Sequence, residues 1–496
     1  MNLTIDPWIP ALRADGRREL FSLQDLFGQA HELRDLAVKP HERIALMRLL
    51  LCITQAALDG PADEDDWEQC QPLIQPRVRA YLDKWRGSFE LFGDGPRFLQ
   101  LPNLQTGKES DEGNAATKLD LALATGNNST LFDNFAGAAR TQQAARSAVN
   151  LVTFQCFAPG GRIGVARWNG RETAGKGSSN HAPCTPSSMV HTLLLSHSLL
   201  HTVHLNLLSR ETVTDSIGQN RWGQPGWELP VKKTEDQAAI ANATLTYLGR
   251  LVPLSRAVRL DDTGTTIVLA NGLDYPIFPA FRETTATIIK RKDKEELAVL
   301  PSSTNRSLWR QLAAVSVRRR SAADVTCGPL ALAHTSSSGN TVLWVGALVT
   351  DKAKIEDVIE SSYSLPPGMF TDFGRAAYEK GVAHAEEREG LLIQAVKAYA
   401  NSLKVAAPAY DKARQQFWTR VEQHLSSLFD LARNIDLVAD LPNSAWGKAV
   451  QSAVIDAYEH SCSRQTPRQI EAYAYGLRRL NFRPKVNQPT TNTAHE

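Results

Sequence analysis

The sequence contains few cysteines, and none of them forms a C-x-x-C pair. Its six thiols are scattered along 496 residues: Cys52, Cys70, Cys156, Cys184, Cys327 and Cys462. This distribution excludes a disulfide framework and a cysteine zinc site, and it is typical of buried thiols in a reducing cytoplasm. We expect no metal and no cofactor.

Long apolar runs and a secretion signal are also absent. A membrane span needs about 18 or more apolar residues in a row, and the sequence has no such run. The N-terminus, MNLTIDPWIP, lacks the basic start and the apolar stretch of a signal peptide. We therefore expect a cytoplasmic protein without membrane contact.

The sequence also lacks a large excess of charge of either sign. The chain has 55 basic and 53 acidic residues, which gives a net charge of +2. Any nucleic-acid binding must therefore come from local patches rather than from a global field. A hydrophobic content of 42% is ordinary for a globular protein, and the length predicts two or three domains.

Residues 159–180, PGGRIGVARWNGRETAGKGSSN, have the most unusual composition. They include six glycines and four basic residues against one acid. Glycine allows close approach of the backbone and basic side chains attract phosphate, so the segment suits a nucleic-acid groove. An ordinary surface loop is the alternative. The P-loop pattern fails because Gly177 stands where the motif requires a hydroxyl.

The apolar patterns indicate an α+β protein with a mixed N-terminal domain, residues 1–363, and an all-α C-terminal domain, residues 364–496. In the first domain we expect helices over 41–58, 78–89 and 187–208, and strands over 265–269, 285–289 and 341–348. A linker at 364–368 precedes helices over 371–403, 410–434, 444–463 and 467–480. These four predict a four-helix bundle, and the polar tail, residues 484–496, is expected to be disordered.

Three polar loops are candidates for contact with nucleic acid. The first carries Phe132, Asp133 and Asn134, an aromatic ring beside a hydrogen-bonding amide. The second is the glycine-rich segment with Gly175, Lys176, Gly177 and Ser178, and the third is the tip with Ser338, Gly339 and Asn340. Each also has a plain structural interpretation, as a loop anchor or a hairpin turn. Arginines 318–320 add a small basic patch.

Catalytic motifs are missing, but one histidine pattern suggests an alternative function. His197, His201 and His204 would share one face of the expected helix, as in a metal-dependent hydrolase. The glutamate that such a helix needs beside its first histidine is replaced by Ser198. A structural scaffold without DNA contact is a third hypothesis.

Several stretches together resemble the CasA family, the large subunit of the type I-E CRISPR complex Cascade. They are Asn2-Leu3, residues 6–10 (DPWIP), Ser22-Leu23, residues 48–53, Trp85 and residues 89–100. The resemblance covers essentially the whole chain. It implies a non-catalytic subunit that reads the protospacer-adjacent motif (PAM) of double-stranded DNA, largely from the minor groove. It also implies that the subunit promotes duplex opening for pairing with CRISPR RNA (crRNA) and helps recruit a helicase-nuclease. The implied partners are target DNA, the crRNA-containing Cascade subunits and that helicase-nuclease.

The resemblance also assigns roles to the three loops. Phe132 and Asn134 match the first DNA loop of the family, residues 174–179 match its glycine loop, and residues 338–340 match its strand-opening wedge, with Asn340 as the one amide. A minor-groove lysine of the family falls near Thr265, where this chain has none, and Lys176 is a candidate substitute. Some members have a cysteine zinc site, which is not expected here because no cysteine lies between Cys184 and Cys327.

Overall fold

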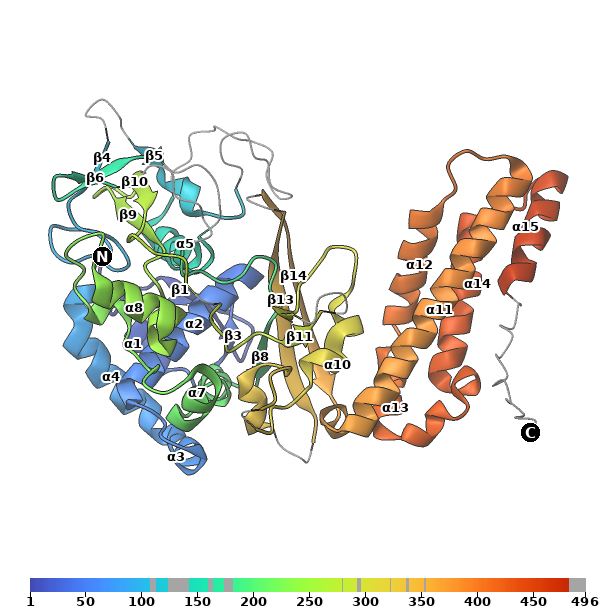
Figure 1. Cartoon of the computed structure of the whole chain (residues 1–496), viewed down its shortest axis with the longest axis horizontal. Coiled ribbons are helices and arrows are strands. Elements are labelled where there is room, and N and C mark those ends of the chain that lie inside the picture. Colours follow the sequence, from blue (N-terminus) through green and yellow to red (C-terminus); the bar gives the residue numbers. More distant parts are fainter. Residues whose placement is uncertain are drawn as a thin grey trace, which may run out of the picture. The chain divides into compact units, whose positions relative to one another are not determined.

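The computed structural model describes residues 1–107, 113–123, 142–158, 164–173, 182–278, 280–291, 296–321, 323–335, 339–351 and 354–480. The chain divides into two compact units, Met1–Ser364 and Leu365–Glu496. The first combines helices with small sheets, whereas the described part of the second is helical (Figure 1). The α+β class is thereby confirmed. No helix among the described residues is long and apolar enough to cross a membrane.

The first unit is built around helix α2 (Pro40–Leu58), the helix expected over 41–58. Every residue from His41 to Gln55 is buried. The helix packs against α4 (Ile74–Trp85), α5 (Ala144–Phe157), α9 (Tyr247–Leu251) and strand β13 (Thr341–Asp351). Its polar side chains must therefore find partners inside the protein. The other helices of this unit are α1 (Leu23–Gly28), α3 (Glu64–Gln69), α6 (Leu199–Leu205), α7 (Arg210–Ile217), α8 (Gln237–Leu245) and α10 (Leu312–Val315).

The described strands of the first unit form five small sheets, with orders β2-β1-β3, β5-β10-β9, β11-β12, β14-β13-β8 and β4-β6-β7. Strand β10 contains most of the expected strand 265–269, and β13 contains the strand expected over 341–348. Strand β14 ends inside the expected linker. The strand bounds besides β13 are β1 (Ile9–Arg13), β2 (Arg18–Phe21), β3 (Leu33–Leu36), β4 (Leu104–Thr106), β5 (Asn114–Ala115), β6 (Ala166–Trp168), β7 (Arg171–Glu172), β8 (His191–Leu195), β9 (Arg256–Leu260), β10 (Thr266–Asn271), β11 (Ile288–Lys290), β12 (Leu297–Val299) and β14 (Lys354–Leu365).

The helix expected over 187–208 is wrong, because this stretch forms strand β8 followed by the short helix α6. Strand β8 pairs with β13, from Val342 opposite Leu195 to Gly346 opposite His191. Four of its five residues are buried, so it has no polar face to reveal a strand. A continuous apolar run of this kind is compatible with either structure. Ser198 then caps α6, since its side chain accepts from the amide of His201 at 3.3 Å.

Part of the glycine-rich segment is an ordered hairpin rather than a loop. Strands β6 and β7 pair through Arg167 with Glu172 and Trp168 with Arg171. The two turn residues between them, Asn169 and Gly170, both have positive φ, at 50° and 77°. An Asn-Gly pair with this backbone is the favoured two-residue hairpin turn.

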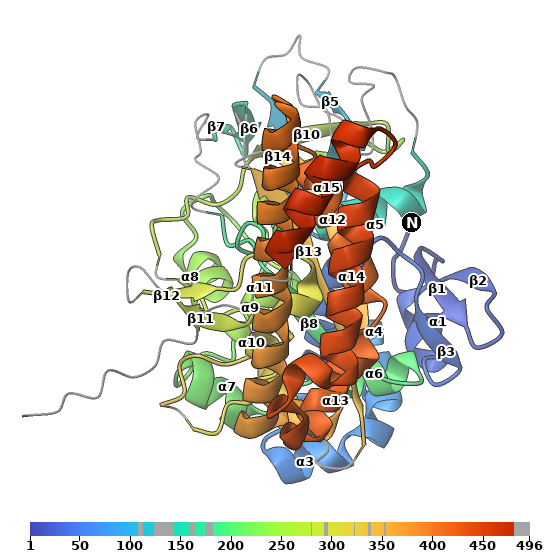
Figure 2. The same ribbon diagram turned by 90° about the vertical axis from the view of Figure 1, so that its right-hand side faces the viewer.

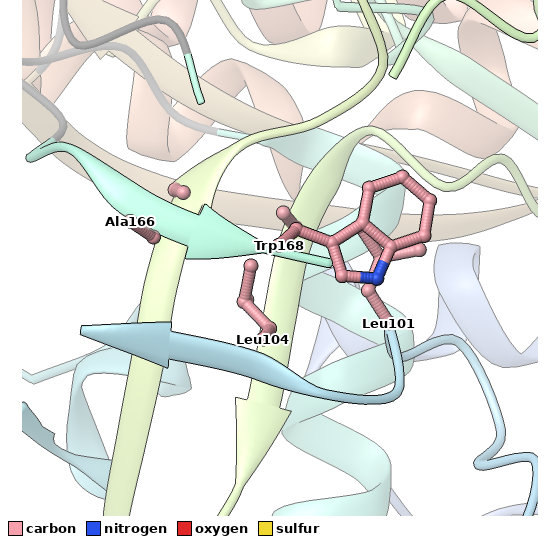
Figure 3. Close-up of a cluster of buried hydrophobic side chains, with 6 residues drawn as sticks. Leu101, Leu104, Ala166 and Trp168 are labelled. Atoms are coloured by element: carbon pink, nitrogen blue, oxygen red, sulfur yellow. The ribbon is translucent and has the colours of Figure 1, made fainter. Parts of the chain in front are cut away.

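Trp168 anchors this hairpin in a small core. Its ring is 3% exposed and packs with buried residues of β4, β9 and β10 (Figure 3). Its indole nitrogen donates to the carbonyl of Pro102 at 2.8 Å. The cluster consists of Leu101, Leu104, Ala166, Trp168, Ala257 and Ala270. It therefore holds the described part of the glycine-rich segment against the β5-β10-β9 sheet.

The second unit contains the long helix α11 (Asp372–Leu403) and α12 (Tyr410–Glu422), α13 (Leu425–Arg433), α14 (Ala445–Ser461) and α15 (Pro467–Leu480). Helix α11 contacts each of the other four, and α12 contacts α14 (Figure 2). The single helix expected over 410–434 is wrong, because it breaks at Gln423-His424. Because of this break, the described residues of the second unit form five helices instead of the expected four.

Candidate nucleic-acid interface

Most of the predicted DNA-contacting residues lie outside the described part of the chain. These are Phe132, Asp133 and Asn134, the four residues Gly175, Lys176, Gly177 and Ser178, and Ser338. Gly339 and Asn340 are described.

Gly339 and Asn340 lead directly into strand β13. Gly339 has φ of +92° and open space where a Cβ would stand. The Asn340 amide donates to the Ser364 hydroxyl at 3.1 Å, which ties it to the end of β14. Asn340 also lines a cavity of about 670 Å³ together with Arg34 and His197.

The chain that follows the glycine-rich segment meets the other end of β13. Asn340 precedes the first residue of this strand, whereas the Ser188 hydroxyl donates to the carbonyl of Thr350 at 3.1 Å. The strand runs from Thr341 to Asp351, so these two contacts lie near its opposite ends. The wedge role of residues 338–340 remains a prediction.

Lys118 is a basic residue that sequence reasoning missed, and it precedes the first loop in chain order. It lies in a 3₁₀ turn (Ala116–Leu119) after strand β5, and the amide of Ala116 donates to the carbonyl of Thr265 at 2.9 Å. Its ammonium donates to the Asn114 side chain at 3.0 Å, and no carboxylate of the described residues pairs with it. Burial lowers the pKa of Lys118.

The chain two residues before Lys118 thus contacts Thr265, the position where the resemblance places a lysine. Lys118 lines a polar cavity of about 200 Å³ with Gly113 and Gly164. The sequence carried no signal for it, because only the pairing of β5 with β10 brings the chain just before Lys118 to residues 266 and 267.

The described hairpin of the glycine-rich segment presents two arginines to solvent. Arg167 and Arg171 are exposed, one on each strand, while Trp168 between them is buried. Among the described residues, Arg171 pairs with Glu235 at 3.9 Å, which is a weak surface pair. Both guanidinium groups are therefore available to an anionic partner.

The basic patch at residues 318–320 is largely occupied by internal contacts. Arg318 donates to the carbonyl of Thr335 at 3.0 Å, and Arg319 donates to the carbonyl of Asp215 at 2.7 Å. Arg319 also donates to the Ser216 hydroxyl. Arg318 and Arg319 therefore connect chain segments, Arg318 by holding the residue that precedes the third loop.

The three histidines of the hydrolase hypothesis do not form one helical face. His197 precedes helix α6 and its Nε2 lies 3.1 Å from Nδ1 of His201. The Nε2 of His204 instead lies 2.8 Å from the carbonyl oxygen of Trp67, and its ring stacks on that indole. Among the described residues no three His, Cys, Asp or Glu side chains are grouped to hold a metal ion. The geometry therefore gives no support to a three-histidine metal site.

Comparisons with known proteins agree on one family. The model of the family described as CRISPR-associated protein Cse1 matches residues 2–457. CRISPR-associated protein CasA/Cse1 of Thermus thermophilus is 29% identical over 509 residues, covering 92% of this chain and 91% of that protein.

Solved structures share the fold over 97% of this chain. Thermobifida fusca Cse1 has a TM-score of 0.76 at 20% identity and is covered over 98% of its length. A chain of a CRISPR RNA-guided surveillance complex has a TM-score of 0.70 at 18% identity and is covered over 99%. Because the family match extends over nearly the whole sequence, this chain belongs to the CRISPR-associated Cse1 (CasA) family.

Proposed function

We propose that this chain is the non-catalytic large subunit of a type I-E Cascade and that it recognises the PAM of double-stranded target DNA. The family match over residues 2–457 carries the proposal. The fold shared with a chain of an RNA-guided surveillance complex supports membership of such an assembly. In this role the protein reads a short motif, while base pairing with crRNA reads the remaining sequence.

We assign the DNA contacts to the predicted loops and to the described residues around them. Asn134 supplies a hydrogen-bonding amide, and Gly175 and Gly177 allow the backbone to approach the groove. Arg167, Arg171 and Lys118 supply phosphate attraction beside these loops. Opening of the duplex for crRNA pairing and recruitment of the helicase-nuclease belong to the same proposal.

Selection of PAM sequences from a randomised target library tests this function directly. The reconstituted complex should enrich a short motif, and complex containing Asn134→Ala or Gly177→Phe should lose affinity for the enriched targets. The matched controls are Asn401→Ala and Gly390→Phe, at exposed positions of α11. All four variants should melt near the wild-type temperature. Normal target binding by both loop variants would show that the loop assignment is wrong.

A further inference from the structure

Two buried carboxylates and two partly exposed cations of the first unit form one ion-pair network. Arg146, in the first turn of α5, donates to Glu42 and, at 3.1 Å, to Asp120. The Lys39 ammonium lies 3.7 Å from a carboxylate oxygen of each acid. The side chains of Glu42 and Asp120 are only 2% and 9% exposed. The network is therefore balanced in charge, with its carboxylates on the inside.

This network joins the two described ends of the chain that contains the first loop. Asp120 lies just before residue 123, the last residue described ahead of this loop. Arg146 lies just after residue 142, the first residue described behind it. Glu42 is buried in the first turn of α2. The same guanidinium therefore attaches this junction to the helix around which the unit is built.

Asp120 connects the chain before the loop to the chain after it. Its Oδ2 accepts from Arg146, and its Oδ1 accepts from the backbone amide of Ala122 at 3.0 Å. Burial alone would raise the pKa of Asp120, but the charges of Arg146 and Lys39 and the amide of Ala122 lower it. The carboxylate is therefore ionised at neutral pH and holds both partners.

The contact between Asp120 and Arg146 is not needed to neutralise the buried charge of α2. Glu42 accepts from Arg146 and also, at 3.1 Å, from the backbone amide of Lys39, so it keeps these partners without Asp120. What Asp120 adds is a fixed separation between the two chain ends. A chain segment whose ends are fixed has less conformational freedom to lose when it binds a partner.

We propose that Asp120 is a positioning residue for target DNA, which acts by fixing the chain on both sides of Asn134. This inference rests on the proposed function, because that function assigns a base contact to Asn134. Asp120 itself does not contact the DNA in this role. Its negative charge repels phosphate, so removal of that charge has opposite effects in the two possible roles of this residue.

Target binding by the reconstituted complex tests the sign of this effect. If Asp120 acts only through its charge, Asp120→Asn should bind DNA as well as wild type or more tightly. We expect instead about tenfold weaker binding of a duplex with the selected PAM, which is the size of one lost base contact. A duplex without the PAM should not be bound more weakly than by wild type. Asp120→Glu keeps the carboxylate and should bind the PAM duplex more tightly than Asp120→Asn.

Two further variants separate positioning from folding. Glu19→Gln is the matched control, because Glu19 is a partly buried acid that accepts from Arg13 at 2.7 Å. It should leave target binding unchanged. Thermal unfolding of the full chain checks that Asp120→Asn is folded at the assay temperature. If it is not, Asp120→Ser gives the same test, since its hydroxyl retains an acceptor for the Ala122 amide but cannot pair with Arg146 as a carboxylate does.

A double variant shows whether Asp120 acts through Asn134. Asn134→Ala should weaken target binding in the otherwise unchanged complex. It should have little further effect in complex that already carries Asp120→Asn, because the same contact is then already lost. Two residues that act independently would instead multiply their effects on affinity.

Three results would overturn the positioning role. The first is normal or tighter binding of the PAM duplex by Asp120→Asn, and the second is a full multiplication of the two effects. If only these occur, while Asn134→Ala alone binds weakly, the proposed function stands and the positioning role fails. The third result is normal binding by Asn134→Ala alone, which would remove the loop assignment of the proposed function and the positioning role together.

Discussion

Glu283 is the residue on which two buried guanidinium groups depend. It is 2% exposed, and each of its oxygens accepts from a different arginine. Burial alone would raise the pKa of Glu283, but the charges and hydrogen bonds of Arg48 and Arg250 outweigh it and hold the pKa at about 2. The carboxylate therefore stays ionised and connects α2 with the segments that contain residues 250 and 283.

Glu283→Gln should destabilise the first unit by about 3–5 kcal/mol, because it leaves two buried charges without a counterion. Asp83→Asn is the control, since Asp83 and Arg86 form a half-exposed surface pair. Its effect should stay below about 1 kcal/mol. Denaturant unfolding followed by tryptophan fluorescence measures both. Equal effects of the two variants would contradict the buried pair as a stabilising contact.

The same variant has a defined pH dependence. Because the folded pKa of Glu283 lies below its ordinary value of 4.5, its contribution is complete above about pH 5 and is lost as the pH falls toward 2. Glutamine does not titrate. The stability difference between wild type and Glu283→Gln should therefore be constant from pH 7 to 5 and shrink below pH 4.5. A difference that grows on acidification would reverse this sign.

At the scale of elements, Gly476 is one of the glycines that allow helices of the second unit to pack closely. A Cβ added at Gly476 of α15 would overlap the Tyr458 hydroxyl of α14 and lie 2.7 Å from the carbonyl oxygen of Ala395 on α11. Gly390, on the same helix as Ala395, is exposed and has open space at this position. Substitution of Gly476 therefore tests helix packing, whereas substitution of Gly390 tests helix propensity alone.

Gly476→Ala should destabilise the second unit by about 1–3 kcal/mol, because the backbone of α11 cannot move away freely. Gly390→Ala should stabilise it by roughly 0.5–1 kcal/mol through helix propensity alone. Calorimetry of the full chain measures both. Stabilisation by both substitutions would mean that α15 does not pack this closely.

Helices with a regular apolar spacing or a clear start signal were predictable from the sequence. Elements that depend on tertiary pairing were not. The helix at 467–480 has the bounds of α15, since Thr466-Pro467 marks its start and its apolar spacing is regular. Strand β8 was missed because it is buried on both faces. The Asn169-Gly170 turn had a readable signal, the Asn-Gly pair, but the surrounding glycines suggested a loop.

The candidate site shows the same division. The composition of residues 159–180 was readable, and Arg167 and Arg171 of this segment are exposed in the structure. The ion pairs of Arg146 were not predictable, because Asp120 and Glu42 lie 26 and 104 residues away from it in the chain. Charge that folding brings together leaves no pattern in the sequence.

At the scale of the whole molecule, the near balance of charge limits how the proposed DNA binding can arise. With a net charge of +2, the chain has no global attraction for a polyanion. Binding must come from a few local contacts, and we expect it to depend on the assembled complex. Among the residues that the structure describes, the exposed Arg167 and Arg171 are candidates for such contacts.

The salt dependence of DNA affinity measures how many phosphates these arginines contact. Each phosphate contact adds about 0.9 to the slope of log affinity against log salt. Complex containing Arg167→Gln together with Arg171→Gln should therefore show a slope smaller by about two than wild type, with an unchanged PAM preference. Arg468→Gln, in the second unit, should leave the slope as it is. An unchanged slope in the double variant would place the hairpin away from the DNA backbone. The attraction for phosphate would then have to come from Lys118 and from the predicted loops.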